Sequence, residues 1–279
     1  MKTSSTRTAL SPLKNLWLDA IFPPRCAGGS EASRRCEIWS RDLFCDCCAQ
    51  TLQILEPNRD ETPLCSCCGA PMKSARAATF CADCRDNRYH AAPPFDAARS
   101  VYDYTGAIRP AIHRLKYSGK TALAKPLAQL LIEFLRTSST RCVAYDEIDL
   151  IVPVPLHRFR KWQRGFNQSE LLAREIGREF QIPSCEVLRR TRFTPPQVEL
   201  SREERQQNVQ GAFALRDNDL RSNALHSNAL RDTKTKIEGA TILLIDDVYT
   251  TGATLKECAQ VLKTAGAKRV FVLTLARSV

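Results

Sequence analysis

The sequence contains no long hydrophobic run, and its acidic residues are outnumbered by its basic ones. No stretch approaches the roughly 18 apolar residues of a membrane-spanning helix, so we expect no insertion into a membrane. The first 24 residues lack the sustained apolar segment of a secretory signal, which favours a cytoplasmic protein. The 30 Asp and Glu against 41 Lys and Arg give a net charge of +11, which predicts anionic partners such as phosphates or nucleic acid.

Cysteine and proline divide the chain into two parts. Ten of the 13 cysteines lie between Cys26 and Cys84, and the Pro93-Pro94 pair that follows is typical of a boundary. We therefore expect a Cys-rich region over residues 1–94 and a second domain over residues 95–279. Residues 216–236 of that domain contain a repeated five-residue unit, which we interpret as a loop expansion without function.

Four cysteines have the spacing of a structural zinc site. Cys65 and Cys68 form one CxxC pair, Cys81 and Cys84 form another, and 12 residues separate the two pairs. In a reducing compartment, clustered cysteines serve as metal ligands rather than as disulfides. Two CxxC turns supply the four thiolates of a tetrahedral Zn²⁺ site, which we prefer over an iron–sulfur cluster or a redox-active dithiol.

A second cysteine group is spaced less regularly. Cys26, Cys36, Cys45 and Cys48 would supply four sulfurs, but only the last two form a CxxC pair. Two interpretations of this group remain open: a second Zn²⁺ site, and a decayed site that holds no metal.

The stretch TILLIDDVYTTGAT, residues 241–254, has the pattern of a strand, two acids and the turn before a helix. The apolar run 242–245 predicts a buried strand, and with the helical pattern from Leu255 and the apolar run 270–275 it predicts a βαβ unit in a parallel sheet. Free N–H groups at a helix start favour phosphate. The carboxylates of Asp246 and Asp247 suit sugar hydroxyls or a divalent cation, so the stretch predicts a site for a ribose 5-phosphate.

Three basic segments precede this stretch. The strand pattern at 149–152 leads into a cationic loop at 157–168, at the sheet edge where open α/β sheets bind ligands, which predicts pyrophosphate contact. Residues 113–117 are either a phosphate-facing patch or a solvated helix end. Residues 189–210 are polar and basic, and they form either a lid over the site or a plain surface loop.

Together these motifs resemble the ComF family of phosphoribosyltransferase-like proteins, which has ComFC-like and GntX-like members in bacteria. The DDVYTTGAT segment is similar to the signature of type I phosphoribosyltransferases, and the RGFNQ motif and the cysteine pairs extend the likeness over nearly the whole chain. The resemblance implies a type I phosphoribosyltransferase fold, an N-terminal zinc-binding region, and a link to natural competence and the use of incoming DNA. Where many relatives carry a CxxC pair, this chain has Cys26 and Gly29, a departure from the family pattern.

The resemblance also implies how phosphoribosyl pyrophosphate (PRPP) is bound. The two acids would hold the ribose diol, residues 248–254 the 5-phosphate, and residues 155–157 the pyrophosphate. The PRPP-binding residues are then Pro155, Leu156, His157, Arg158, Val248, Tyr249, Thr250, Thr251, Gly252, Ala253 and Thr254. A flexible hood would contain Arg192, Gln197, Arg202, Arg205 and Asn208.

The chemistry that follows is Mg²⁺-dependent displacement of pyrophosphate at C1 of PRPP by an acceptor that the sequence does not identify. The expected catalytic residues are Asp246, Asp247, Lys116 and Arg164, with Arg158 as a further cation beside the leaving group. Two alternatives stay open. One is a protein that binds PRPP without transferring the ribosyl group, and the other is a factor that binds single-stranded DNA or other competence proteins.

Overall fold

The structure is a computed structural model that describes residues 26–27, 43–55, 63–72, 79–85, 93–137, 144–192, 209–216 and 236–278. Cys36, the five-residue repeat and the hood residues Gln197, Arg202, Arg205 and Asn208 lie outside the described residues. None of the helices in the described ranges is long and apolar enough to cross a bilayer.

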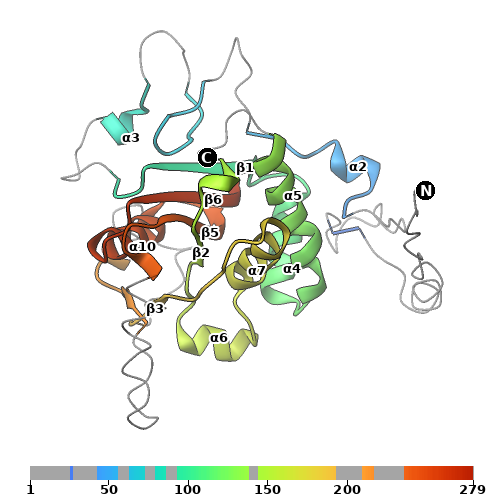
Figure 1. The fold of residues 1–279 in the computed structure, drawn as a ribbon. Coiled ribbons are helices and arrows are strands. Elements are labelled where there is room, and N and C mark those ends of the chain that lie inside the picture. Colours follow the sequence, from blue (N-terminus) through green and yellow to red (C-terminus); the bar gives the residue numbers. More distant parts are fainter. Residues whose placement is uncertain are drawn as a thin grey trace, which may run out of the picture.

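A four-stranded parallel sheet lies at the centre of the protein (Figure 1). Its order is β1-β6-β5-β2, with β1 at Ala97–Asp103, β2 at Leu150–Pro153, β5 at Thr241–Tyr249 and β6 at Arg269–Arg277. All four residues of β2 and the first five of β5 are buried, which explains why these strands are continuous apolar runs in the sequence.

Helices cover both faces of this sheet, which confirms the predicted α/β fold with helices flanking a parallel sheet. On one face, Leu243 and Leu273 share a core with α4, α5 and α7; on the other, Leu244 and Val272 share a core with Leu255 of α10. The helices of this part are α4 (Ile108–Tyr117), α5 (Ala124–Thr137), α6 (Arg158–Arg164), α7 (Gln168–Phe180) and α10 (Ala253–Thr264), with 3-10 turns η2 (Thr121–Leu123) and η3 (Tyr145–Glu147).

The Cys-rich part is packed against the edge strand β1. The N–H of Asp103 donates to the carbonyl of Gln53 (2.9 Å), and the N–H of Ala98 donates to the carbonyl of Cys67 (2.6 Å). These bonds satisfy backbone groups that an edge strand would otherwise expose. The Cys-rich part contains the short helices α2 (Asp46–Ala49) and α3 (Ala82–Arg85), and its cysteines belong to the same cores as the sheet.

Two local predictions are wrong. The strand predicted to end at residue 245 continues through both acids to Tyr249, because the nine-residue β6 offers it partners as far as Arg277. The expected loop at 157–168 contains the helix α6 instead. His157 caps α6 by accepting the N–H of Phe159 at its Nδ1 (3.2 Å), and Gly165, with a φ of 83°, ends it.

A small antiparallel hairpin, β3 (Leu188–Arg190) with β4 (Phe213–Leu215), stands beside the main sheet. It brackets the predicted hood, of which Arg192 is described and donates to the carbonyl of Gln210. The hairpin carries Arg190 to the carboxyl end of β2, where it forms an isolated parallel bridge with His157.

We expect Gly177→Ala to destabilise the protein, although alanine normally favours a helix by about 1 kcal/mol over glycine. A Cβ at residue 177 in α7 would lie 2.6 Å from the carbonyl oxygen of Ile182, so the backbone would have to shift. Thermal or urea unfolding should show a loss of about 1–3 kcal/mol, the usual cost of overpacking. The neighbouring exposed Arg178→Ala should change stability by less than about 0.5 kcal/mol, and equal effects of the two variants would refute the contact.

Candidate active site and cysteine clusters

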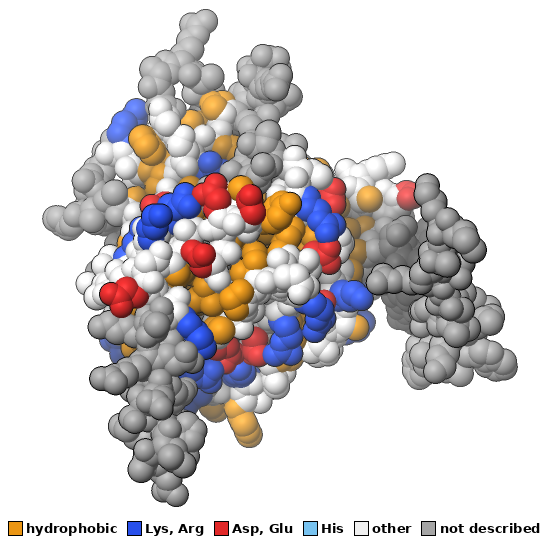
Figure 2. Space-filling model, viewed as in Figure 1, with side chains coloured by type: hydrophobic (Ala, Val, Ile, Leu, Met, Phe, Trp, Pro, Cys, Tyr) orange, Lys and Arg blue, Asp and Glu red, His pale blue; other side chains and the backbone are white. Residues whose placement is uncertain are grey.

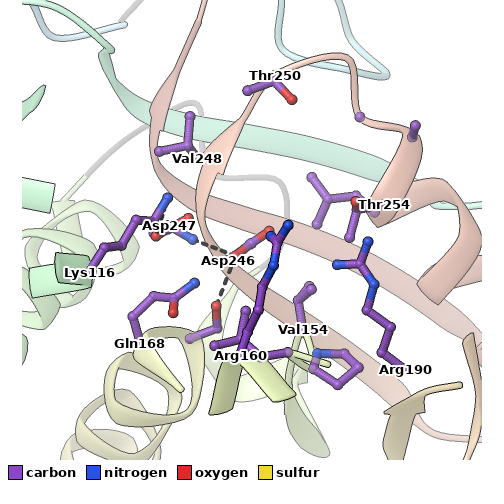
Figure 3. Close-up of a pocket in the computed structure, with 16 residues that line it drawn as sticks. Lys116, Val154, Arg160, Gln168, Arg190, Asp246, Asp247, Val248, Thr250 and Thr254 are labelled. Atoms are coloured by element: carbon purple, nitrogen blue, oxygen red, sulfur yellow. Dashed lines mark hydrogen bonds and ion pairs between the residues drawn. The ribbon is translucent and has the colours of Figure 1, made fainter. Parts of the chain in front are cut away.

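A cavity that is open to solvent lies at the carboxyl ends of β2 and β5 (Figure 3). Its lining consists of Lys116, Val154, Pro155, Leu156, Arg160, Gln168, Ser169, Arg190, Asp246, Asp247, Val248, Thr250, Gly252, Ala253, Thr254 and Leu255. Open α/β sheets bind their ligands at this edge, beyond the carboxyl ends of the strands. The acids, the hydroxyl-rich turn and Pro155-Leu156, which the sequence placed in one site, are therefore brought together.

Asp247 and Lys116 form a mostly buried ion pair at one wall of the cavity. The Lys116 Nζ lies 2.7 Å from an Asp247 carboxylate oxygen, and the Asp247 side chain is only 4% exposed. Burial disfavours the charge of Lys116, but the attraction of Asp247 and the hydrogen bond to it outweigh burial and raise the pKa of the lysine. Of the segment 113–117, Lys116 faces the cavity, whereas the rings of His113 and Tyr117 pack on each other.

Asp246 has a different environment from its neighbour. It is half-buried and accepts hydrogen bonds from Ser169 Oγ (2.8 Å) and from the N–H of Asp247 (2.9 Å). Burial and the charge of Asp247 raise the pKa of Asp246 to about 7, against the opposing effects of Lys116 and Ser169. A cation or a pair of hydroxyl donors bound here would stabilise the charged carboxylate and bring this pKa down.

The turn before α10 forms the opposite part of the cavity. Gly252 has a φ of 74°, and the helix begins at the next residue and runs for 12 residues. Thr251 Oγ1 accepts the N–H of Ala253 (3.4 Å) just before the helix, whose N-cap residue is Gly252, while Thr250 and Thr254 line the cavity. The N–H groups and dipole of a helix start, together with threonine hydroxyls, favour a bound anion.

The cations of the cavity are partly different from those predicted. Arg160 and Arg190 line it, and Figure 3 shows both side chains reaching into it. Burial and the charge of Arg160 lower the pKa of Arg190. The predicted Arg158 lines a neighbouring cavity instead, and Arg164 donates to Gln168 Oε1 (2.7 Å).

Three further predicted residues, His157, Tyr249 and Thr251, are not among those that line the cavity. Arg160 and Gln168 lie in the segment 157–168 that was predicted to contact pyrophosphate, and Arg190 lies in the predicted lid, but none of them was singled out as a site residue. Ser169 was not predicted at all. Had a helix been recognised in 158–164, Arg158 and Arg160 would have been expected on different sides of it, and so in different cavities. The position of Arg190 depends on the β3–β4 hairpin, for which the sequence gives no local signal.

The first cysteine cluster has the geometry of a metal site. The sulfurs of Cys65, Cys68, Cys81 and Cys84 all lie within 4.8 Å of one another, and those of Cys68 and Cys81 are 3.6 Å apart. Tetrahedral Zn–S bonds of about 2.3 Å place sulfurs roughly 3.8 Å apart, so these residues fit a zinc ion. The N–H of Cys81 points at Cys65 Sγ (3.3 Å), a contact that stabilises a thiolate.

The second cluster contains three of its four predicted members. The sulfurs of Cys26, Cys45 and Cys48 lie within 4.8 Å of one another, all three residues are buried, and Cys36 lies outside the described residues. Arg114 of α4 donates to the carbonyl of Cys26 (2.7 Å), so this cluster is attached to the face of the sheet that carries Lys116.

A second cavity lies between α6 and the β3–β4 hairpin. Its lining includes the cations Arg158, Lys161, Arg189, Arg190 and Arg216, with Glu186 as the only carboxylate among its lining residues. On α6, Trp162 is 80% exposed and Phe159 is 51% exposed. Figure 2 shows Lys and Arg side chains gathered over the lower part of this view, where α6 lies.

Comparison with known proteins agrees with this architecture. Residues 167–278 match the family described as "Phosphoribosyl transferase domain". DNA utilization protein YhgH of Escherichia coli K12 is 33% identical over 222 residues, which cover 79% of this chain and 86% of that protein. Competence protein F of Haemophilus influenzae is 30% identical over 217 residues, or 77% of this chain and 85% of that protein.

Competence protein ComFC of Bacillus subtilis is 32% identical over 219 residues, which cover 77% of this chain and 78% of that protein. Each of these three relatives aligns with more than three quarters of this chain. The chain belongs to the ComF family, together with DNA utilization protein YhgH and the competence proteins F and ComFC.

Proposed function

We propose that this protein binds PRPP in the cavity at the carboxyl ends of β2 and β5 and transfers its phosphoribosyl group to an acceptor. One observation carries the proposal: the acidic pair and the anion-binding turn of α10 line the same cavity, together with three cations. A ligand with a diol, a phosphate and a second, more highly charged anion would satisfy the acidic pair, the turn and the cations at once. PRPP has these features on one ribose ring.

Each part of PRPP has a partner in this arrangement. The acidic pair would accept hydrogen bonds from the ribose hydroxyls, and the turn from Thr250 to Thr254 would hold the 5-phosphate. Lys116, Arg160, Arg190 and the Pro155-Leu156 backbone would face the pyrophosphate. A Mg²⁺ ion bound with PRPP would be held by Asp246 and phosphate oxygens and would neutralise part of the charge on the leaving group.

The reaction would break the bond from C1 to pyrophosphate and form a bond from C1 to the acceptor. Positive charge develops on the ribose ring in the transition state, and negative charge develops on the departing pyrophosphate. Fixed cations such as Arg160 and Arg190 would stabilise that negative charge, and preorganised groups of this kind are each worth about 3–4 kcal/mol. Binding at the turn would hold C1 in line with the acceptor. If no acceptor supports turnover, the protein would be a regulator that binds PRPP in this cavity without transferring its ribosyl group.

Single-stranded DNA is a second candidate ligand, and α6 is the observation that favours it. Trp162 and Phe159 are exposed there, with ring centroids 6.0 Å apart, beside the cations of the second cavity. Exposed aromatic rings among cations bind the bases and phosphates of single strands. The relatives' names point in the same direction, so we propose a cytoplasmic role in natural competence, alone or with other competence proteins.

Structural Zn²⁺ completes the proposal. Cys65, Cys68, Cys81 and Cys84 would hold one ion. A second ion would be bound by Cys26, Cys45 and Cys48, with Cys36 as the fourth ligand.

Replacing both acids, Asp246→Asn with Asp247→Asn, should abolish Mg²⁺-dependent PRPP binding measured by calorimetry. The amides cannot replace the charged oxygens that hold a cation and a diol. The variant should stay folded with a lower Tm, because Lys116 loses the charge of its partner. Asp146→Asn, at an exposed carboxylate in η3, is the matched control and should bind normally. Wild-type affinity in the double variant would refute the site.

PRPP binding should also depend on pH. Because the pKa of Asp246 is raised to about 7, this carboxyl is protonated in a growing fraction of molecules as the pH falls from 8 to 6. Only the carboxylate binds a cation, so affinity should fall by up to about tenfold per pH unit below 7 and level off above 8. Calorimetry in buffers of different ionisation enthalpy should detect the released proton. Asp246→Asn should bind more weakly than the wild type and with a shallower pH profile, and a flat profile in the wild type would contradict the assignment.

For the second candidate, Trp162→Ala should weaken binding of a fluorescent single-stranded oligonucleotide by about tenfold, within the roughly 1–3 kcal/mol of one stacked base. Binding by the wild type should fall steeply with salt. Tyr145→Ala removes an aromatic ring that is 43% exposed at the far end of α7, and it should bind like the wild type. Equal affinities of the three proteins would exclude α6 as the DNA-binding surface.

A further inference from the structure

The first cysteine cluster and the phosphate-binding turn are connected by one buried arginine. Arg277, the last residue of β6, is only 9% exposed. Its Nη1 donates to the carbonyl of Cys68 (2.7 Å), and its Nη2 lies 3.7 Å from Cys68 Sγ. On its other side the guanidinium lies over the ring of Tyr249, with its Cζ 4.0 Å from the ring centroid. The arginine thus contacts both the CxxC turn of Cys65 and Cys68, called the knuckle below, and Tyr249 at the end of β5.

Tyr249 carries this contact to the turn. It is 3% exposed, and its carbonyl accepts the N–H of Ser278 (2.9 Å), which ties the ends of β5 and β6 together. A Cβ at Gly252 would lie 2.3 Å from the Tyr249 hydroxyl and 2.5 Å from the ring carbon that bears it. The backbone of the cavity-lining turn therefore rests directly on the phenol. Substitution of Gly252 would force these groups apart.

The knuckle packs directly against strand β1 of the sheet. The N–H of Ala98 donates to the carbonyl of Cys67 (2.6 Å), and Gly69 approaches Ala98 so closely that a Cβ there would lie 2.6 Å from its carbonyl oxygen. Arg277 therefore connects two elements that are each held in place, the Cys65–Cys68 turn and the end of β5 at Tyr249. The position of its guanidinium fixes the distance between that turn and β5.

We infer that the metal site positions the phosphate-binding turn through a stack of Cys68, Arg277, Tyr249 and Gly252. Arg277 and Tyr249 are positioning residues in this arrangement, since neither lines the cavity. The inference rests on the proposed PRPP site and adds that its affinity depends on the metal. Four thiolates around a Zn²⁺ ion leave a net negative charge, which compensates the buried guanidinium and holds it over the ring.

The test compares two arginines of β6. Arg277→Gln removes the cation from the stack. Arg269→Gln is the matched control, because Arg269 also lies over an aromatic ring (Phe271, 5.5 Å) but at the other end of the strand. Three quantities are measured on the full chain: bound zinc, hydrogen exchange of the amides from 250 to 254, and PRPP affinity.

Arg277→Gln should retain its zinc, exchange the turn amides faster than the wild type, and bind PRPP about tenfold more weakly. Arg269→Gln should match the wild type in all three. Removing zinc from the wild type with a chelator should reproduce the faster exchange of the turn. If Arg277→Gln does not fold, Tyr249→Leu replaces it, with the same expected changes.

Wild-type exchange and affinity in a folded, zinc-bound Arg277→Gln would overturn the inference. If the wild type itself binds no PRPP, the proposed function fails, and the exchange measurements alone decide whether the metal site orders the turn. Unchanged exchange of the turn after zinc removal would also overturn the inference.

Discussion

The pairing of β5 with β6 beyond the apolar core is the constraint on which the site depends. Because the ladder continues through residues 246–249, both acids are held on the regular backbone of β5 at the carboxyl end of the sheet. Asp247 meets Lys116 of α4, while Asp246 meets Ser169 at the start of α7. Two adjacent carboxylates thereby acquire different environments. Asp247 is paired with a lysine, whereas Asp246 has a raised pKa and accepts hydrogen bonds from a hydroxyl and an amide.

Much of the fold could be predicted because its signals are local. The apolar runs at 149–152, 242–245 and 270–275 lie in or overlap β2, β5 and β6, and the helical pattern from Leu255 lies in α10. Both acids and most of the turn that follows them line a single cavity. The cations of the site could not be predicted in the same way. Arg190 reaches the cavity through a hairpin whose strands are separated by more than 20 residues, and Arg160 depends on the helical winding of α6. Basic composition identified these segments but could not select their inward-facing members.

The Cys-rich part is better understood as an integral layer of the protein than as an appendage. One cysteine cluster shares its core with α4, and the other shares its core with α10 and the carboxyl end of the sheet. Ligands at an edge of a small parallel sheet need rigid backbone around them, and the described sheet has only four strands to supply it. A metal ion held by the cysteine clusters would add rigidity without requiring a larger hydrophobic core. The boundary near residue 94 stays a prediction from sequence.

The backbone bonds between β1 and the Cys-rich part have a consequence for handling the protein. β1 is buried along most of its length, and its outer edge bonds to Gln53, Leu55 and Cys67 rather than to another strand of the sheet. Detaching these segments would leave an unpaired strand of the kind that recruits strands from other molecules. Conditions that detach the Cys-rich part from β1 would therefore favour self-association during purification.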